Sequence, residues 1–253
     1  MKKKLVAVLA CRNNGSRLYA KPLQNLSKDI TVLDNILDTL KKNKSISDII
    51  LVISNKQDNV IYKKIAKKNK IKYLFGSDLD VLKRLILGGN KTKATDIFRI
   101  TTESPFISYD KIDKIWDNHK ILDNDLSIYD NKIDGMGFEI FKISALKRSH
   151  RNGKKKHKSE LCDLYIRENE KKFKIKLYSD TYLKFKARLT IDNPEDLIYC
   201  RKLFDKLKYY YPNFPIKNIV KFISLNKSDF KLIKNFIPNS KSINNLWTKR
   251  KTL

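Results

Sequence analysis

The chain has 253 residues, 41 % of them hydrophobic, and carries 55 basic against 27 acidic residues for a formal net charge of +28. This composition suits a globular protein with a substantial core, and no segment has the apolar length of a membrane span. Its three cysteines, Cys11, Cys162 and Cys200, are far apart without a C-x-x-C pair, which argues for a reducing compartment and against a disulfide framework. We therefore expect a soluble, cytoplasmic protein without a membrane partner.

Strands and helices alternate strictly in the first hundred residues. Short apolar runs predict buried strands at residues 5–10, 48–54, 71–75 and 96–101. Apolar residues at helical spacing predict helices that begin near Thr31 and that cover residues 58–69 and 80–87, the last one capped by Gly88-Gly89. This alternation predicts an α/β fold, a Rossmann-like three-layer sandwich with a mostly parallel sheet.

The alternation loosens in the second half of the chain. We expect helices over 109–120 and 159–169, extended segments over 126–129, 138–143, 173–178 and 187–192, and a solvated basic loop over 148–158. Asn193-Pro194 followed by acidic residues predicts the start of a helix that runs to about residue 210. The proline-containing break at 211–215 predicts a boundary between a main domain, 1–210, and a helical appendage, 211–253, with helices over 216–224 and 227–236.

The excess of positive charge has two interpretations. The protein could bind a polyanion such as nucleic acid, or the composition could be biased, because lysine, asparagine and isoleucine are abundant together. The lysines are spread along the chain and alternate with apolar positions, which favours a bias. An anionic substrate would be attracted in either case.

A flexible cationic loop follows the first predicted strand. Arg12, Arg17 and Lys21 supply positive charge, and Gly15 allows a close approach of the backbone to a ligand. Open α/β sheets bind phosphorylated ligands at the carboxyl ends of their strands. The pattern matches neither G-x-G-x-x-G nor G-x-x-x-x-G-K-[ST], so the loop alone does not distinguish a phosphate site from an ordinary basic surface loop.

Two carboxylates follow other predicted strands. Glu103 comes after the strand at 96–101, and Asp192 ends the strand at 187–192. Because the carboxyl ends of neighbouring strands meet at one crevice, both side chains are expected to face the basic loop. Two carboxylates beside a phosphate site suit Mg²⁺, which takes few protein oxygens together with water and substrate phosphate. The alternative is that each acid caps the helix that follows it.

Several segments, in the same order over nearly the whole chain, carry a family resemblance. They are R-N-N-G-S-R-L-Y-A-K at 12–21, G-S-D-L-D-V-L-K-R at 76–84, R-I-T-T-E-S-P-F-I at 99–107, D-G with E-I-F at 134–141, Y-I-R-E-N at 165–169, R-L-T-I-D-N-P-E-D-L at 188–197 and S-I-N-N at 242–245. The chain resembles the cytidylyltransferases that activate sugars and sugar acids, including CMP-Kdo and CMP-acylneuraminate synthetases. The branch of spore-coat polysaccharide biosynthesis is the most similar.

The resemblance implies roles for particular residues, carried over position by position. They are Arg12, Arg17 and Lys21 for catalysis; Ala10, Arg12, Gly15, Ser16, Arg17, Lys21, Asp80, Arg84 and Thr101 for the nucleotide; Glu103 and Asp192 for Mg²⁺; and Glu139 and Glu160 for the acceptor. Residues 1–210 would form the nucleotidyltransferase domain, and a homodimer is the usual assembly of the relatives.

The resemblance implies a Mg²⁺-dependent cytidylyltransferase. It would transfer CMP from CTP to an anionic sugar-type acceptor, a sugar acid or a phosphorylated compound, with release of pyrophosphate, in surface polysaccharide or glycan biosynthesis. Three residues depart from the pattern of the resembling family. Glu103 stands where the family usually has Asp, Thr102 where the most similar branch has Gly, and Leu161 where that branch commonly has His. A catalytically weakened relative is therefore one alternative, and a basic nucleic-acid-binding protein is the other, although the strands contain no RNP-like aromatic set.

Two other residue types have simpler interpretations. His119, His150 and His157 have no metal-ligand spacing and are expected at the surface. Cys11 adjoins the basic loop and is expected to pack as a small apolar residue.

Overall fold

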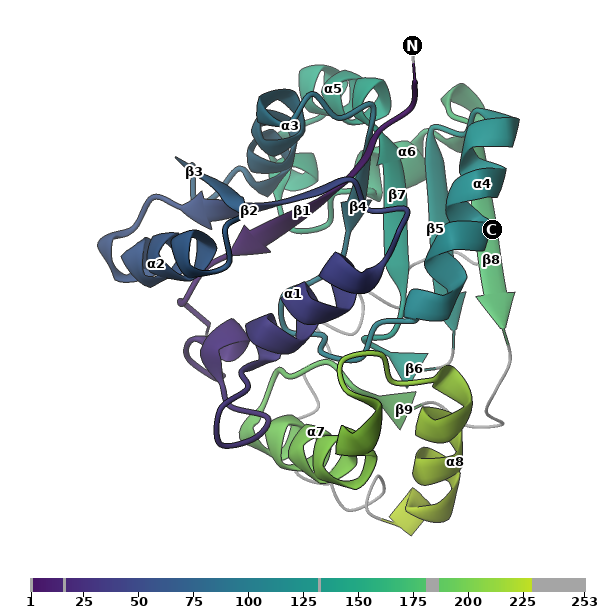
Figure 1. Ribbon diagram of the computed structural model, residues 1–253. Coiled ribbons are helices and arrows are strands. Elements are labelled where there is room, and N and C mark those ends of the chain that lie inside the picture. Colours follow the sequence, from purple (N-terminus) through teal and green to yellow (C-terminus); the bar gives the residue numbers. More distant parts are fainter. Residues whose placement is uncertain (1, 16, 132, 181–186, 229–253) are drawn as a thin grey trace.

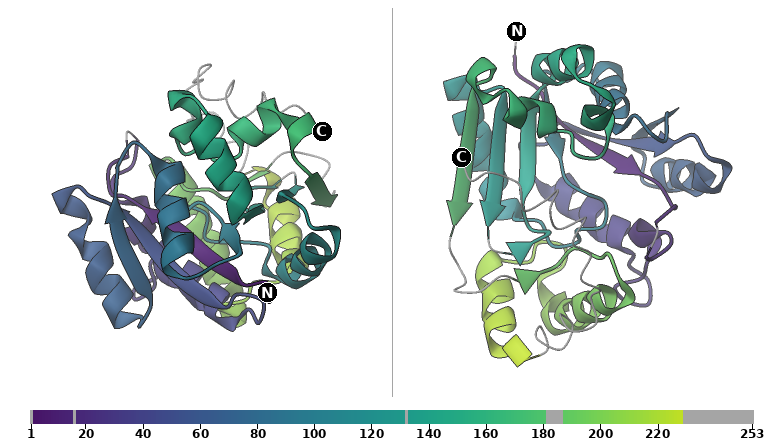
Figure 2. Two further views of the ribbon diagram at one scale, coloured as in Figure 1. Left: turned by 90° about the horizontal axis from the view of Figure 1, so that it is seen from above. Right: turned by 180° about the vertical axis from the view of Figure 1, so that it is seen from behind.

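A seven-stranded sheet with helices on both faces forms the body of the protein (Figures 1 and 2). The computed structural model describes residues 2–15, 17–131, 133–180 and 187–228. The strand order is β3-β2-β1-β4-β7-β5-β8, and β7 runs antiparallel to both of its neighbours. The strands are β1 (Leu5–Cys11), β2 (Asp48–Ser54), β3 (Lys72–Gly76), β4 (Asp96–Arg99), β5 (Leu126–Asn131), β7 (Phe138–Lys142) and β8 (Ile175–Asp180).

Two layers of helices cover the sheet, as the predicted three-layer α/β sandwich requires. Helices α1, α2 and α4 pack with α7 and α8 in one apolar core, and α3, α5 and α6 pack in the other. The helices are α1 (Val32–Lys42), α2 (Ile61–Lys68), α3 (Val81–Lys91), α4 (Ile112–Leu122), α5 (Ile143–Asn152), α6 (Leu164–Glu168), α7 (Pro194–Leu207) and α8 (Ile216–Leu225). None of the helices within the described ranges combines the length and apolarity needed to span a membrane.

The first strand illustrates why the apolar runs become central strands. Leu5, Ala7 and Leu9 point into one core, whereas Val6 and Val8 point into the other. Because successive side chains in a strand alternate between faces, a strand covered on both sides has to be apolar throughout. The prediction of a mostly parallel sheet is confirmed, with β1 parallel to both β2 and β4.

Helix α3 contains Gly88-Gly89 in its interior, so the predicted C-cap at this pair is wrong. The helix continues to Lys91 and ends at Thr92. A Cβ atom at Gly88 would lie only 2.7 Å from Cγ1 of both Val8 and Val52. Glycine at this position therefore lets the helix axis approach the sheet closely, and it is not a signal for helix termination.

Substituting Gly88 should reveal this close packing. Gly88→Val is expected to lower the free energy of unfolding by about 1–3 kcal/mol, because the added side chain overpacks the interface between α3 and the sheet. Urea denaturation of the two proteins measures the difference. Lys91→Val, at an exposed position of the same helix, is the control. An unfolding free energy for Gly88→Val equal to that of this control would contradict the explanation.

Helix α5 replaces the first part of the predicted basic loop at 148–158. Residues Ile143–Asn152 are helical, with Ala145 and Leu146 buried, and a 3₁₀ turn (Lys155–Lys158) follows. The cationic side chains thus form the polar face of an amphipathic helix, whose apolar face was too short to be recognised from the sequence. The predicted helix over 159–169 is also too long, because α6 covers only Leu164–Glu168.

The segment at 187–192 is not a strand of the main sheet, contrary to the prediction. Only β9 (Ala187–Arg188) is extended with a partner, and it pairs in parallel with β6 (Ile133–Asp134). Figures 1 and 2 show this small sheet between the main sheet and helices α7 and α8. Gly135, with φ +91°, passes so close that a Cβ there would lie 2.5 Å from the backbone nitrogen of Thr190.

Two of the three histidines are buried, contrary to the prediction, and the third is partly exposed. His119 is fully buried, with Nδ1 2.8 Å from Ser127 Oγ and Nε2 3.2 Å from Asp96 Oδ1. His157 is 4 % exposed, and His150 is partly buried. His119 lies on the inward face of α4, where its two hydrogen bonds compensate for its desolvation.

The described part of the C-terminal segment, residues 211–228, packs onto the main body. Helix α8 buries Ile219, Phe222 and Ile223 in the same core as α1 and α7. The division into 1–210 and 211–253 stays a prediction. The predicted helix over 227–236 lies almost wholly outside the described residues, as do the S-I-N-N segment and Ser16.

Candidate active site

The basic loop turns back sharply at the carboxyl end of β1. A Cβ atom at Gly15 would lie 2.4 Å from the carbonyl oxygen of Leu18, so the turn needs glycine. The backbone nitrogen of Ala20, whose φ is +49°, donates to the Asn13 carbonyl at 2.8 Å. Lys21 then starts a short 3₁₀ turn, Lys21–Leu23. The loop therefore presents its cations from a constrained backbone.

The cations of the loop meet the two predicted metal-binding carboxylates. Lys21 Nζ lies 2.5 Å from Asp192 Oδ1 and 3.5 Å from Glu103 Oε2. Arg17 Nη2 lies 3.1 Å from the same Asp192 oxygen. Arg12 is paired separately, with Nη2 2.9 Å from Glu160 Oε2. Four of the residues that the sequence predicted for catalysis or metal binding thus form one cluster.

The position of Asp192 depends on two residues that the sequence analysis did not assign to the site. Arg188 donates to Asp192 Oδ2 through Nη2 and to Asp196 Oδ1 through Nε, at 3.1 Å. Asp196 Oδ2 accepts from the backbone nitrogens of Asp192, at 2.9 Å, and Asn193, at 2.8 Å. The capping box that begins α7 was visible in the sequence, and it could have indicated that Asp196 faces back toward Asp192.

The two carboxylates of the cluster differ in proton affinity. Burial raises the pKa of Asp192, but the nearby Lys21, Arg188 and Arg17 outweigh it and leave the pKa below its usual value. Burial also raises the pKa of Glu103, and there the Lys21 ammonium does not compensate, because Asp192 and Glu160 add repulsion. Asp192 is therefore the stronger anion at the centre of the site.

Two of the predicted nucleotide residues, Arg84 and Asp80, have structural contacts of their own with residues outside this cluster. Arg84 is only 2 % exposed and donates through Nη1 to the carbonyls of Val52, at 2.9 Å, and Cys11, at 3.3 Å. Asp80 caps α3, accepting from the Lys83 backbone nitrogen at 2.9 Å. Cys11 itself is fully buried, and burial raises the pKa of its thiol to about 12, so it packs as an inert thiol.

The remaining predicted positions lie on β1 and directly after β4. The carbonyl of Ala10 accepts from Thr102 Oγ1 at 3.0 Å, which ties the first strand to the segment that carries Glu103. Thr101 Oγ1 lies 2.7 Å from Ser104 Oγ. Thr102 stands where the resembling family has a glycine, and its hydroxyl has a structural role in the hydrogen bond to Ala10.

The two predicted acceptor residues have different surroundings. Glu139 is 5 % exposed, and its Oε2 lies 2.6 Å from Arg99 Nη1 in a buried ion pair. Glu160 is exposed and pairs with Arg12, while its backbone carbonyl accepts from Arg99 Nη2 at 2.9 Å. Arg99 thus connects the buried Glu139 to the segment that reaches the basic loop.

The donor set of the cluster fits a divalent cation that also binds phosphate. Within the described part of the chain, no group of three or more His, Cys, Asp or Glu side chains could hold a metal by itself. Mg²⁺ commonly takes one or two carboxylates and completes its shell with water and substrate phosphates. Glu103 and Asp192 supply such a pair, and the Lys21 ammonium lies between them as the neutralising cation.

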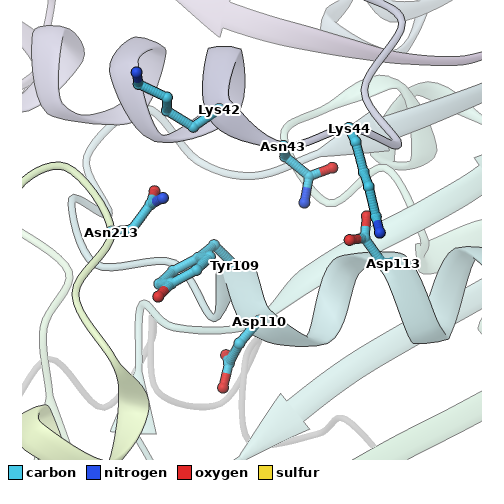
Figure 3. Close-up of a pocket in the computed structure, with 7 residues that line it drawn as sticks. All are labelled: Lys42, Asn43, Lys44, Tyr109, Asp110, Asp113 and Asn213. Carbon is cyan, nitrogen blue, oxygen red and sulfur yellow. The ribbon is translucent and has the colours of Figure 1, made fainter.

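A cavity of about 210 Å³ lies elsewhere in the structure, and Figure 3 shows the side chains around it. It opens between the end of α1, the start of α4 and the segment before α8, and none of its lining residues belongs to the ion-pair cluster. The lining residues are Lys42, Asn43, Lys44, Tyr109, Asp110, Asp113 and Asn213.

The mostly parallel sheet and the cationic loop facing two carboxylates define an α/β protein of the nucleotidyltransferase type. Residues 6–221 match the family model described as cytidylyltransferase. An uncharacterized protein of Methanocaldococcus jannaschii, MJ1063, is 32 % identical over 230 residues, which cover 88 % of this chain and 91 % of that protein. The chain belongs to the cytidylyltransferase family, and it is a nucleotidyltransferase that uses CTP.

Solved structures share this fold. A cytidylyltransferase from Leptospira borgpetersenii superimposes with a TM-score of 0.81 at 24 % identity, over 90 % of this chain and 97 % of that one. A CMP:2-keto-3-deoxy-manno-octonic acid synthetase in complex with CTP has a TM-score of 0.65 at 12 % identity, over 81 % of this chain and 99 % of that one. The protein Rv0371c from Mycobacterium tuberculosis, solved with manganese, has a TM-score of 0.57 at 14 % identity, over 79 % of this chain and 99 % of that one.

Proposed function

We propose that this protein is a Mg²⁺-dependent cytidylyltransferase that transfers CMP from CTP to a sugar acid or a phosphorylated sugar-type acceptor. The observation that carries the proposal is the cluster in which Lys21 and Arg17 meet Asp192 and Glu103. Cations that can bind phosphate and carboxylates that can bind a metal are there within hydrogen-bonding distance of one another.

Binding of CTP would exchange one set of ion pairs for another. Arg12, Arg17 and Lys21 now contact carboxylates, and triphosphate oxygens would take the place of those carboxylates. Arg17 Nε is buried and has no hydrogen-bond partner among the described residues, so it offers a further donor. The carboxylates released by Lys21 would need a new counter-charge, which a divalent cation supplies.

The reaction is an in-line displacement at the α-phosphorus of CTP. An acceptor oxygen forms a new P–O bond, the bond to the β-phosphate bridging oxygen breaks, and pyrophosphate leaves with the electron pair. An acceptor phosphate brings an unprotonated oxygen, whereas an acceptor hydroxyl gives its proton to solvent. Lys21 and Arg17 would offset the charge that grows on the pyrophosphate, and Arg12 would hold the nucleotide in line.

The metal and the acceptor are assigned from the chemistry of the neighbouring side chains. Mg²⁺ held by Asp192 and Glu103 would neutralise phosphate oxygens and fix their geometry. Glu139 and Glu160 would meet hydroxyl groups of the acceptor, with Arg99 keeping both in place. A role in surface polysaccharide or glycan synthesis and assembly as a homodimer belong to the same proposal.

Pyrophosphate release tests the proposed reaction. The protein is incubated with CTP, MgCl₂ and a panel of sugar acids and sugar phosphates, with ATP, GTP and UTP in parallel. We expect release that requires CTP, an acceptor from one of these classes and the metal, and that stops when EDTA is added. Release from no combination, in a protein that is folded by circular dichroism, would contradict the proposal.

A further inference from the structure

Three cations surround Asp192, and they divide between its two carboxylate oxygens. Lys21 Nζ and Arg17 Nη2 lie at Oδ1, whereas Arg188 Nη2 binds Oδ2. Lys21 and Arg17 belong to the loop that the proposed function turns toward phosphate. Arg188 belongs to the segment that carries Asp192 itself, four residues earlier. When the loop cations leave for the nucleotide, Arg188 is the cation that stays.

Arg188 is anchored from behind by a buried acid. Its Nε donates at 3.1 Å to Oδ1 of Asp196, whose side chain is 3 % exposed. The other Asp196 oxygen accepts backbone N–H groups at the start of α7, including that of Asp192, so this carboxylate cannot rotate away. The guanidinium is therefore held between two carboxylates.

The end of β6 and the loop that follows it also restrict the movement of Arg188. Arg188 Nη1 lies 3.9 Å from Asp134 Oδ2, and the backbone nitrogen of Leu189 donates to the Asp134 carbonyl at 2.7 Å. Gly135 crosses directly over Thr190, where a side chain would collide with backbone atoms. The backbone on either side of Arg188 is thus held by the small β6–β9 sheet, and the arginine has little freedom to follow the loop cations.

We propose that Arg188 is a positioning residue that holds Oδ2 of Asp192, so that Oδ1 alone faces the cation that replaces Lys21. The inference rests on the proposed function, because it requires Asp192 to bind a divalent metal. A guanidinium suits this task, since one N–H can bind Asp196 while another binds Asp192. A lysine ammonium at the same position would keep the charge but would lose the planar two-armed geometry.

Mn²⁺ binding measured by electron paramagnetic resonance in the presence of CTP tests the inference without depending on turnover. Arg188→Met is expected to weaken Mn²⁺ binding by about 10–100-fold, the usual effect of losing a residue that orients a metal ligand. Arg188→Lys should recover part of the affinity. In steady-state assays, kcat at limiting metal should fall, while KM for CTP at saturating metal stays near the wild-type value.

The control is Arg201→Met, which removes an exposed arginine of α7 whose Nε donates to the Asn25 carbonyl. A folded Arg188→Met protein that binds Mn²⁺ as tightly as this control overturns the inference. If Arg188→Met does not fold, Arg188→Lys decides: weaker binding than wild type supports the inference, and equal binding overturns it.

The same experiment separates this inference from the proposed function. Wild-type protein that binds Mn²⁺ with CTP but transfers no CMP contradicts the proposed reaction, while weaker binding by Arg188→Met still supports the positioning role. Wild-type protein that binds no Mn²⁺ in the presence of CTP overturns the metal assignment and the role of Arg188 together.

Discussion

Replacing Lys21 by methionine is expected to slow CMP transfer by about 10²–10³-fold, the loss typical of removing one preorganised charge-stabilising group. The Lys21 side chain is 13 % exposed, and its ammonium lies at the centre of the cluster, in contact with both Asp192 and Glu103. Methionine keeps the length and removes the charge that would meet the leaving pyrophosphate. Pyrophosphate release at saturating CTP and metal measures the effect, and Lys28→Met, at an exposed position of the same segment, is the control.

The same substitution should act in the opposite direction on metal binding without nucleotide. The ammonium and a divalent cation compete for the same two carboxylates, so Lys21→Met is expected to bind Mn²⁺ more tightly than wild type when CTP is absent. This second measurement distinguishes a lost catalytic charge from a damaged fold, which would weaken both activity and metal binding. Retention of more than about a tenth of wild-type activity would contradict the role of Lys21.

Removing Glu139 is expected to lower the free energy of unfolding by about 3–5 kcal/mol, because it leaves a buried guanidinium without its counter-charge. The Arg99 and Glu139 side chains are 11 % and 6 % exposed, with 2.6 Å between Nη1 and Oε2. Burial lowers the pKa of Arg99, but Glu139 and other nearby groups outweigh it and raise the pKa, so the arginine stays charged. Urea denaturation of Glu139→Ala measures the loss.

Two controls separate burial from the simple loss of an ion pair. Asp205→Ala removes an exposed acid that pairs with the equally exposed Lys208 at 2.9 Å, and it should cost about 1 kcal/mol or less. The double replacement of Arg99 by Met and Glu139 by Leu should recover most of the stability, because two apolar side chains need no counter-charge. If Glu139→Ala is no less stable than Asp205→Ala, the Arg99–Glu139 pair does not behave as a buried ion pair.

The local pattern of the sequence predicted the central strands correctly because their environment imposes a simple rule. A strand such as β2, covered on both faces, must be apolar through its centre, here residues 49–53. The same reasoning failed for residues 187–192, where a continuous β pattern is buried by crossing chain segments and only Ala187–Arg188 pairs with another strand. The sequence showed that residues 187–192 are buried, but it did not show which segments of the chain bury them.

Polar residues in the core were harder to anticipate than apolar ones. His119 lies one turn after Ile115 and Trp116 on the inward face of α4, so helical spacing could have indicated its burial. Its hydrogen-bond partners Asp96 and Ser127 come from β4 and β5. Whether these two residues meet His119 depends on the order of the strands in the sheet. The prediction of a surface position was therefore wrong for His119, and it was also wrong for His157.

Local patterns in the sequence were enough to predict the α/β alternation, the cationic loop with Arg17 and Lys21, and the two acids Glu103 and Asp192 as metal-binding candidates. Those features depend on neighbours within a few residues, where periodicity and turn chemistry act. The positions of Lys21 between the two acids and of Arg188 at the far oxygen of Asp192 came only from the folded chain. The Lys21 contacts join segments that are distant in the sequence, whereas Arg188 and Asp192 are only four residues apart. The geometry of both is set by the packing of the β6–β9 sheet and α7, which no local pattern encodes.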